Sequence, residues 1–362
     1  MKSTRAILFL GFLLPLAAQA QDGEFVVSAD HGYKRYPAAA MDRRGEVLVA
    51  WQESFAVLGQ RYAADGAPRG GNFQVGTNSE NYRGPVSAAI DPRGFSVVWE
   101  EEGHFSGSYS FFRRFDAQGT ELATRFLGRE AGSVVASDPR GISVVVTPDQ
   151  KGLLATRYDA AGHYLGQPFR VVRYPTREAQ VAVDATGSFV VVWSTPQGIF
   201  GRRYDAAARP RGPVFQVTPQ ASGPLAMAGN AGGSFAVSWT VAHRVLARLY
   251  RSDGEPAGPP VLVDPTTNSH PAVAMDTAGR FLVVWAQRPP PGDEFESWLI
   301  LRRFFRASGE PEAFALPLGR GGRSQNPQPA AAAGPAGDFL VVWIRDYATG
   351  GADIIGRRLA AP

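Results

Sequence analysis

Residues 179–217 read AQVAVDATGSFVVVWSTPQGIFGRRYDAAARPRGPVFQV. An alternating apolar segment runs into a turn signal at Asp184–Gly187. The apolar run Phe189–Trp193 follows, and it is too short for a helix and suits a strand buried on both faces. Ile199–Asp205 alternates again, and Phe215–Val217 is a brief fourth segment. The stretch therefore predicts four short β-strands joined by turns.

Tryptophan shows how often this unit recurs. The second predicted strand ends on Trp51, Trp99, Trp193, Trp239, Trp285 or Trp343, and Val146 takes that place in the third copy. Four short strands in each repeat of about 40–50 residues are typical of a β-propeller blade. One such sheet cannot bury both faces alone, so the copies must stack. The repeats are placed near 37–75, 85–127, 133–171, 179–217, 224–263, 271–316 and 329–359.

The two ends of the chain predict how the ring closes. The last copy ends at Ile354–Leu359, its third strand, and no Phe-x-Val segment follows it. The segment Phe25–Val27 near the N-terminus is such a strand without a repeat of its own. Pairing the two would complete the last blade and remove the free sheet edges. We therefore expect an all-β fold, a single seven-bladed β-propeller over residues 21–362, closed by the N-terminal strand.

The first 20 residues have the pattern of a secretory signal peptide. Lys2 and Arg5 precede the apolar run Ala6–Ala18, and Ala18-Gln-Ala20 is a small-x-small cleavage site. The run is short for a membrane span, and no other stretch approaches that length. We expect cleavage near Ala20, a secreted or periplasmic mature protein without a membrane span, and no thiol chemistry, because the chain has no Cys.

Composition argues against several partners. The 37 Lys and Arg exceed the 33 Asp and Glu by only four, and no basic block stands out, so nucleic acid is not an expected partner. The five His residues lack metal-ligand spacing, and the chain has no nucleophile elbow, phosphate loop or dinucleotide fingerprint. We expect no cofactor, no metal and a monomer.

Two classes of turn repeat regularly. In six of the seven repeats, the turn between the first and second strands carries Asp or Asn three positions before Gly, as in Asp184–Gly187; the seventh has Gly334 there. These turns could be read as acidic sites, but Asp caps its own turn and Gly takes a positive φ, so a structural role is expected. Turns between the third and fourth strands are equally regular. In an up-and-down blade both classes lie at one end of the ring.

Loops at the other end vary, and variation on one face often marks the binding side of a repeat protein. The elaborated loops belong to blades 6, 7, 1 and 2, which are contiguous once the ring closes. The candidate binding residues in them are Trp298, Tyr347, Tyr33, Tyr36, Tyr82, His104, Glu101, Asp293, Glu296, Arg35 and Arg345.

Some of these residues have two interpretations. Trp298 could stack on a sugar ring or anchor a partner, or it could fold back over its blade. The run Glu100–Glu102 could include a general base or a metal ligand, but a charge run is more often a solvated surface. The paired arginines of the third strands, such as Arg113–Arg114, are expected to pair with turn carboxylates or to lie between blades.

The repeat Asp-x-x-Gly-x-Phe-Val-Val-Trp … Ile-Phe-Gly-Arg-Arg-Tyr-Asp-Ala-x-Gly … Phe-Gln-Val, clearest at 184–217 and 276–309, resembles that of uncharacterised secreted bacterial propellers. The opening Pro271–Gly279 is distantly similar to NHL-type repeats, which implies ligand binding at loop faces. Ending the second strand on Trp departs from that pattern. The resemblance transfers no active-site residue.

The sequence thus favours a binding module that recognises a protein or a glycan through the loops of blades 6, 7, 1 and 2. The alternative is a polysaccharide hydrolase or lyase with Glu101, Asp293 or Glu296 as acid and base, and Arg35 or Arg345 orienting acidic sugars. Catalysis requires paired carboxylates facing a cleft. A flat face with separated carboxylates and aromatic residues favours binding.

Overall fold

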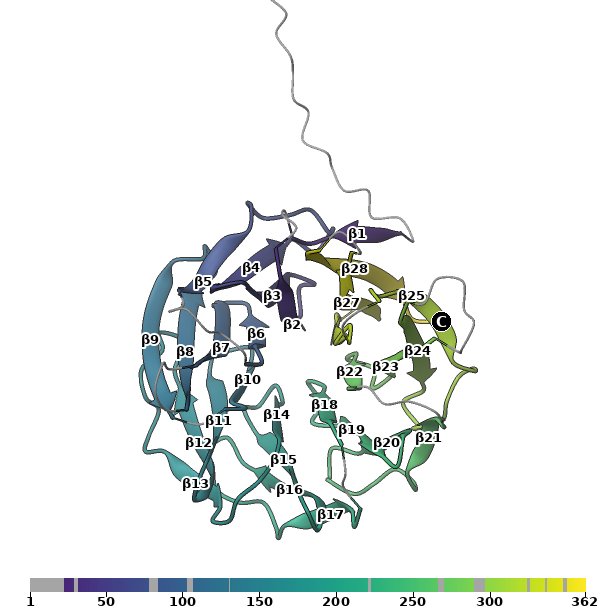
Figure 1. Ribbon diagram of the computed structural model, residues 1–362. Helices are drawn as coiled ribbons and strands as arrows, with labels where there is room; N and C mark the ends of the chain where they lie inside the picture. The colour runs from purple at the N-terminus through teal and green to yellow at the C-terminus, as the bar shows by residue number, and fades with distance from the viewer. Residues whose placement is uncertain are drawn as a thin grey trace, which may run out of the picture.

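The computed structural model describes residues 23–28, 32–77, 84–102, 107–129, 131–220, 223–265, 270–289, 297–323, 326–335, 337–347 and 350–362. Their strands form seven four-stranded sheets, each antiparallel throughout. The sheets stand around a central axis as the blades of a β-propeller (Figure 1). The predicted fold class and the number of blades are confirmed.

The strands of blades 1 to 4, from the axis outward, are β2 (Lys34–Met41), β3 (Val47–Glu53), β4 (Ala56–Tyr62) and β5 (Phe73–Thr77); β6 (Ser87–Asp91), β7 (Gly94–Glu102), β8 (Ser108–Asp116) and β9 (Glu121–Gly128); β10 (Val134–Ser137), β11 (Ser143–Asp149), β12 (Gly152–Tyr158) and β13 (Phe169–Val172); and β14 (Ala179–Val183), β15 (Phe189–Thr195), β16 (Gly198–Tyr204) and β17 (Phe215–Thr218). Those of blades 5 to 7 are β18 (Leu225–Gly229), β19 (Phe235–Val241), β20 (Arg244–Tyr250) and β21 (Val261–Asp264); β22 (Ala272–Met275), β23 (Phe281–Gln287), β24 (Leu299–Phe305) and β25 (Leu316–Arg320); and β26 (Ala330–Ala333), β27 (Asp338–Asp346), β28 (Ala352–Ala360) and β1 (Glu24–Val26).

The N-terminal strand closes the ring as the sequence predicts. β1 lies beside β28, and Glu24, Phe25 and Val26 are opposite Arg357, Gly356 and Ile355 (Figure 1). The ladder continues one bond further, because Val27 N donates to Ile354 O at 2.8 Å. The first and last parts of the chain therefore share one sheet, and blade 7 gains its fourth strand.

The second strand of each blade forms the core. Every residue of β3 and β15 is buried, which is why these strands are apolar without alternation. The tryptophans that end these strands are at most 2% exposed. Their side chains belong to clusters shared by neighbouring blades, since Trp193 packs with residues of blade 3 and Trp343 with residues of blade 6. Burial therefore depends on neighbours, as expected for a repeat fold.

The arginines of the third strands join the blades. Arg61, Arg157, Arg203 and Arg358 each donate to backbone carbonyls in the third-to-fourth strand turn of the next blade. The arginines one position earlier in the third strand donate to backbone carbonyls in the outer strand of the previous blade. These bonds join Arg113 to Val75 O, Arg248 to Val217 O, Arg303 to Leu262 O and Arg357 to Leu318 O. Their predicted structural role is confirmed, although carbonyls rather than carboxylates are the main acceptors.

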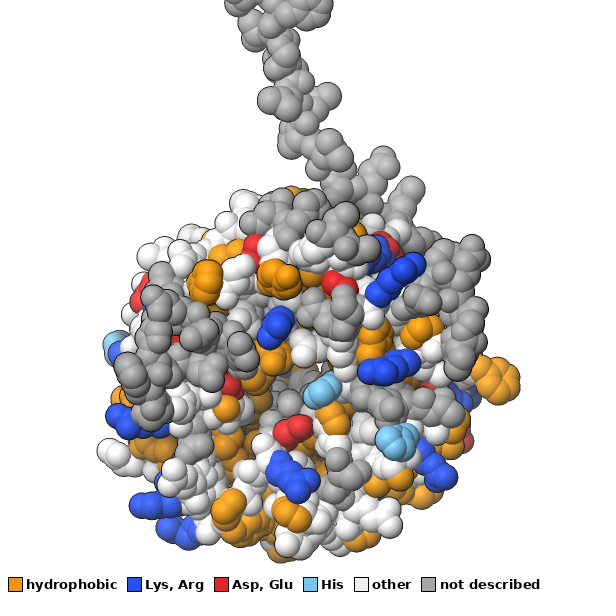
Figure 2. All heavy atoms as spheres, viewed as in Figure 1, with side chains coloured by type: hydrophobic (Ala, Val, Ile, Leu, Met, Phe, Trp, Pro, Cys, Tyr) orange, Lys and Arg blue, Asp and Glu red, His pale blue; other side chains and the backbone are white. Residues whose placement is uncertain are grey.

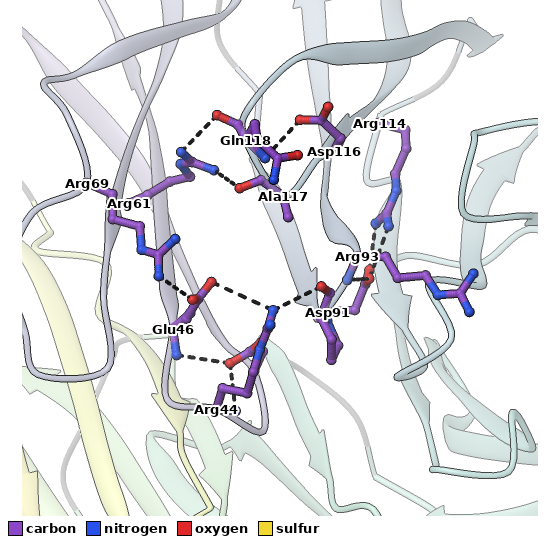
Figure 3. A network of polar contacts seen from close by, with 12 residues as sticks. Arg44, Glu46, Arg61, Arg69, Asp91, Arg93, Arg114, Asp116, Ala117 and Gln118 are labelled. Carbon is purple, nitrogen blue, oxygen red and sulfur yellow. Dashed lines mark hydrogen bonds and ion pairs between the residues drawn. The ribbon is translucent and has the colours of Figure 1, made fainter.

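One carboxylate is an exception, and Figure 3 shows its surroundings between blades 1 and 2. Arg114 binds Asp91 with both terminal nitrogens, at 2.6 and 3.1 Å, and both side chains are buried. Beside them, Arg61 of blade 1 donates to the carbonyls of Ala117 and Gln118 in blade 2. The Arg114–Asp91 pair therefore lies within blade 2, whereas the acceptors that join blade 1 to blade 2 here are backbone carbonyls.

Candidate functional site

The two ends of the ring use their polar side chains differently. We call the end with the first-to-second and third-to-fourth strand turns the turn end, and the opposite end the variable end. At the turn end, Asp42 Oδ1 accepts hydrogen bonds from Arg44 N at 2.8 Å and Glu46 N at 2.9 Å, while Gly45 has φ 82°. The predicted turn capping is confirmed, and these carboxylates serve the fold.

A channel runs along the axis of the ring. Its larger compartment has a volume of about 680 Å³ and is lined by the inner strands of all seven blades. Most of the lining side chains within the bore are Ala, Val and Met, so the bore stays open. Each inner strand pairs on one side only, which leaves one backbone edge facing the axis. Figure 2 views the variable end and shows it hollowed at the centre, with Lys and Arg side chains standing around the opening.

Polar residues form the mouth of this channel at the variable end. In blades 1, 4, 6 and 7, one residue of the inner strand pairs with the residue just before the recurring tryptophan, for example Ala38 with Ala50. Two positions before that inner-strand residue stand Tyr36, Glu178, His270 and Gln328, which are therefore equivalent. All four line the channel, and Arg177 does so beside Glu178. We call these five residues the channel mouth. They belong to blades 1, 4, 6 and 7 and therefore converge from distant parts of the sequence.

Two mouth residues have a strained backbone. Tyr36 and Gln328 have φ of 49° and 45°, and each is followed by a proline, Pro37 or Pro329. A positive φ is uncommon for residues other than glycine, and a following proline restricts the residue to extended conformations. Tyr36 N donates to Gln328 Oε1 at 3.0 Å, which ties the two together. Such strain persists only where the surroundings enforce it, and it clusters at ligand sites.

The ionisable groups of the mouth are unusual. Burial raises the pKa of Glu178, whose Oε2 accepts a hydrogen bond from Leu225 N at 2.8 Å. Desolvation by the surrounding protein also lowers the pKa of His270, although its side chain keeps solvent contact, and this favours the neutral imidazole at pH 7. The guanidinium of Arg177 has no hydrogen-bond or ion-pair partner within the described part of the chain. Among the described residues, the mouth therefore places a guanidinium without a side-chain partner beside an imidazole, a phenol, an amide and a carboxyl group.

Three predicted binding residues lie together on blade 1. Tyr33 is 65% exposed, Arg35 is exposed without a side-chain partner among the described residues, and Tyr36 is at the channel mouth. Phe55, in the turn between β3 and β4, is 61% exposed, and the neighbouring Ser54 N donates to Tyr33 O at 3.0 Å. We call Tyr33, Arg35 and Phe55 the blade-1 patch.

Two further predicted residues hold blade 7 closed. Arg345 Nη2 binds Glu24 Oε2 at 2.6 Å and Arg320 O at 3.0 Å, so it joins β27 to the strand that closes the ring. Tyr347 donates from its hydroxyl to Asp353 Oδ2 at 2.8 Å, and burial, followed by this hydrogen bond, raises its pKa. Both side chains have structural partners.

Trp298 and the glutamates of β7 also have structural partners. Trp298 is 8% exposed, belongs to the core cluster between blades 6 and 7, and lies under Arg288, which is 5.3 Å from its ring. It follows the second of its two interpretations, folding back over its blade. Glu101 accepts a hydrogen bond from Trp99 Nε1 at 3.0 Å. Glu100 is buried and accepts from Gly132 N, so the expectation of a solvated charge run is wrong at this residue.

The other candidate residues are Tyr82, His104, Asp293 and Glu296, and all four lie outside the described residues. They remain predictions.

Sequence reasoning missed Arg177, Glu178, His270, Gln328 and Phe55. For Glu178, His270 and Gln328 the aligned repeats carry a signal. At their shared position other repeats have proline or serine, so a large polar residue there stands out. Phe55 had a weaker signal, an aromatic residue at the tip of a tight turn. Within the described residues, no group of three or more His, Asp or Glu side chains is arranged to hold a metal ion.

Comparison with known proteins agrees with the fold. No protein-family model matches the chain, and neither does any curated protein. Solved structures do match. Hydrazine synthase of Kuenenia stuttgartiensis has 13% identity over 91% of this chain and 96% of that chain, with a TM-score of 0.56. The WD40 domain of Toxoplasma gondii coronin has 9% identity over 96% of this chain and 88% of that chain (TM-score 0.55), and AofleA from Arthrobotrys oligospora has 11% identity over 82% and 89% of the two chains (TM-score 0.52). The similarity is one of fold. At these identities it carries no active site or ligand over to this chain. No helical segment of the described residues has the length and hydropathy of a membrane span.

Proposed function

We propose that this protein is a secreted or periplasmic β-propeller binding module. Its ligand is a protein or a glycan, held at the variable end by the loops of blades 6, 7, 1 and 2. The signal-peptide pattern of residues 1–20 supports the location. Propellers commonly use one loop face for recognition, but the fold hosts many functions, so the residues exposed on that face must decide.

The blade-1 patch is the observation that carries this proposal. Tyr33 and Phe55 are both more than three-fifths exposed and lie beside each other through the Ser54–Tyr33 backbone bond. Aromatic side chains and Arg are the residues that contribute most to binding free energy at interfaces, and aromatic rings also stack on sugars. Arg35, exposed and without a side-chain partner among the described residues, adds a charge that a ligand can neutralise.

A polysaccharide hydrolase or lyase is less well supported. Retaining and inverting glycosidases use two carboxylates that face one cleft. At the variable end, the described carboxylates of Glu100, Glu101 and Glu178 each accept a hydrogen bond from a backbone amide or an indole of the fold. Asp264 accepts one from Trp285 Nε1 at 3.0 Å, and Asp353 accepts one from Tyr347. These carboxylates stabilise blades, which favours recognition over hydrolysis.

The test is binding of the purified protein to a panel of immobilised glycans and candidate surface proteins, with a reducing-end and unsaturated-product assay on every glycan that binds. We expect a ligand that is bound without being cleaved. The double variant Tyr33→Ser with Phe55→Ser should weaken that binding about tenfold or more, as for interface aromatics that each contribute over 1 kcal/mol.

The matched control is Tyr164→Ser. Tyr164 is 55% exposed but follows the turn between β12 and β13, at the turn end. It should leave binding unchanged. Depolymerisation of a bound glycan would replace the proposal with the enzyme alternative. Equal loss of binding in Tyr164→Ser and in the double variant would show that the variable end is not the recognition surface.

A further inference from the structure

The channel mouth offers a second site, distinct from the loops that hold the proposed macromolecular ligand. Its four ring positions come from equivalent places in four blades, and three other blades have Pro85, Ser133 and Pro224 there. Proline and serine suffice to begin an inner strand. The tyrosine, glutamate, histidine and glutamine of the other blades are therefore not required by the repeat.

The mouth combines hydrogen-bonding groups with the guanidinium of Arg177, which has no side-chain partner among the described residues. The amide nitrogen of Gln328 is left to donate, because its oxygen accepts Tyr36 N. The imidazole of His270 and the hydroxyl of Tyr36 add groups that both donate and accept. Arg177 and Glu178 are the charged residues among those described as lining the larger compartment, and Glu178 already accepts Leu225 N. One guanidinium matches a single negative charge.

The dimensions suit a small organic molecule. Ligand pockets are typically about 300–1,000 Å³, and the compartment behind the mouth measures about 680 Å³. The strained backbone and the hydrogen bond between Tyr36 and Gln328 hold these two residues in fixed positions. Such preorganisation is expected at a site that binds its ligand without rearranging. The seven unpaired strand edges add backbone donors and acceptors along the bore.

We propose that the channel mouth binds a polyhydroxylated carboxylic acid, such as a uronic acid, free or at the end of a chain. Its carboxylate binds the guanidinium of Arg177, because the planar guanidinium can donate two parallel hydrogen bonds to the two carboxylate oxygens. Its hydroxyl groups, each both donor and acceptor, bind Tyr36, His270, Gln328 and the carboxyl of Glu178. A simple carboxylate such as acetate would contact only Arg177, and a neutral sugar would contact only the groups that bind the hydroxyls.

Isothermal titration calorimetry of the purified protein tests this with four probes: D-glucuronate, D-glucose, acetate and a linear trigalacturonate. We expect D-glucuronate to bind at least about tenfold more tightly than glucose or acetate, because only the sugar acid makes both the charged contact with Arg177 and the hydroxyl contacts. Trigalacturonate distinguishes the two sources. Tighter binding than for the monomer indicates a chain end, and equal or weaker binding indicates a free sugar acid.

The variants locate the site. Arg177→Ala should weaken D-glucuronate binding about tenfold or more and leave glucose binding unchanged. Arg173→Ala is the matched control, since Arg173 is an exposed arginine of the same connection that does not line the channel. His270→Ala should weaken D-glucuronate and glucose alike. Thermal unfolding of each variant confirms that the fold is intact.

Three results would overturn the inference: no heat of binding with D-glucuronate or trigalacturonate, equal affinity for acetate and D-glucuronate, or equal losses in Arg177→Ala and Arg173→Ala. The outcome is independent of the proposed macromolecular ligand. The variants of Tyr33 and Phe55 test the loops, and none of the mouth variants touches them.

Discussion

The turn end and the variable end of the ring are built from the same strands but differ in what their polar side chains do. At the turn end, aspartates cap their own turns and arginines reach the carbonyls of the next blade. At the variable end, Arg35 and Arg177 have no side-chain partner among the described residues, and Tyr33 and Phe55 are exposed. The difference indicates that one end maintains the ring and the other is left for ligands.

The largest expected effect is at the turn end, in the Arg114–Asp91 pair. Arg114→Met removes a guanidinium that is fully buried and leaves the Asp91 carboxylate uncompensated. Loss of one partner of such a pair destabilises by about 3–5 kcal/mol. Chemical denaturation should show this loss. Arg140→Met is the control, because Arg140 is half exposed in its pair with Asp138, and it should cost no more than about 1 kcal/mol. Similar losses for both variants would contradict the account.

Trp298→Ala tests whether this residue at the variable end belongs to the core. Because Trp298 belongs to the core cluster between blades 6 and 7, its truncation should lower the free energy of unfolding by about 3 kcal/mol. Phe55→Ala, an exposed aromatic at the same end, should change it by less than about 0.5 kcal/mol. Equal stability of the two variants would mean that Trp298 is a surface residue after all.

Glu100 gives a pH-dependent test. Burial raises the pKa of Glu100 to about 7, and the Gly132 amide opposes this. Because the folded pKa lies above the unfolded value, the stabilising contribution is complete below about pH 4.5 and is lost as pH rises through about 7. Glu100→Gln keeps the acceptor for Gly132 N and removes the titration. Its free energy of unfolding should match that of the native protein at pH 4 and exceed it by about 3 kcal/mol at pH 8.5. A constant difference across this range would contradict the assignment.

The smallest expected effect concerns backbone strain at the channel mouth. Tyr36→Asn should raise the free energy of unfolding by about 0.5–1 kcal/mol, because Asn tolerates positive φ better than Tyr. Tyr33→Asn, three residues earlier and without positive φ, serves as the control and should have little effect. Thermal unfolding measures both. A loss of stability in Tyr36→Asn alone would mean that the tyrosine side chain contributes more than the strain costs.

The sequence predicted the architecture because the repeat is written in local patterns. Phe189–Trp193 and its copies specify buried strands, and Asp184–Gly187 specifies a capped turn. Phe25–Val27 identified the closing strand because it had no repeat of its own. These features depend on periodicity and turn chemistry, which are readable along the chain.

The site was predicted only in part, because its residues converge from distant blades. Tyr33, Arg35 and Tyr36 are close together in the sequence, so a single loop suffices to predict them as a group, and their role in binding stays a prediction. From the sequence, Trp298 and Arg345 were equally good candidates for binding a ligand. Trp298 instead packs between blades 6 and 7, and Arg345 binds Glu24, and both contacts involve segments far apart in the sequence. The channel mouth depends on the ring bringing His270 and Gln328 near Tyr36 and Arg177, and no local pattern encodes that convergence.

The most direct measurement is a crystal structure of the protein grown or soaked with D-glucuronate. We expect one sugar acid at the variable end, on the axis, with its carboxylate within hydrogen-bond distance of Arg177 and its hydroxyls on His270 and Gln328. A sugar acid bound instead among the aspartate-capped turns at the other end of the channel, or a mouth without ligand at saturating concentration, would contradict the division of roles between the two ends.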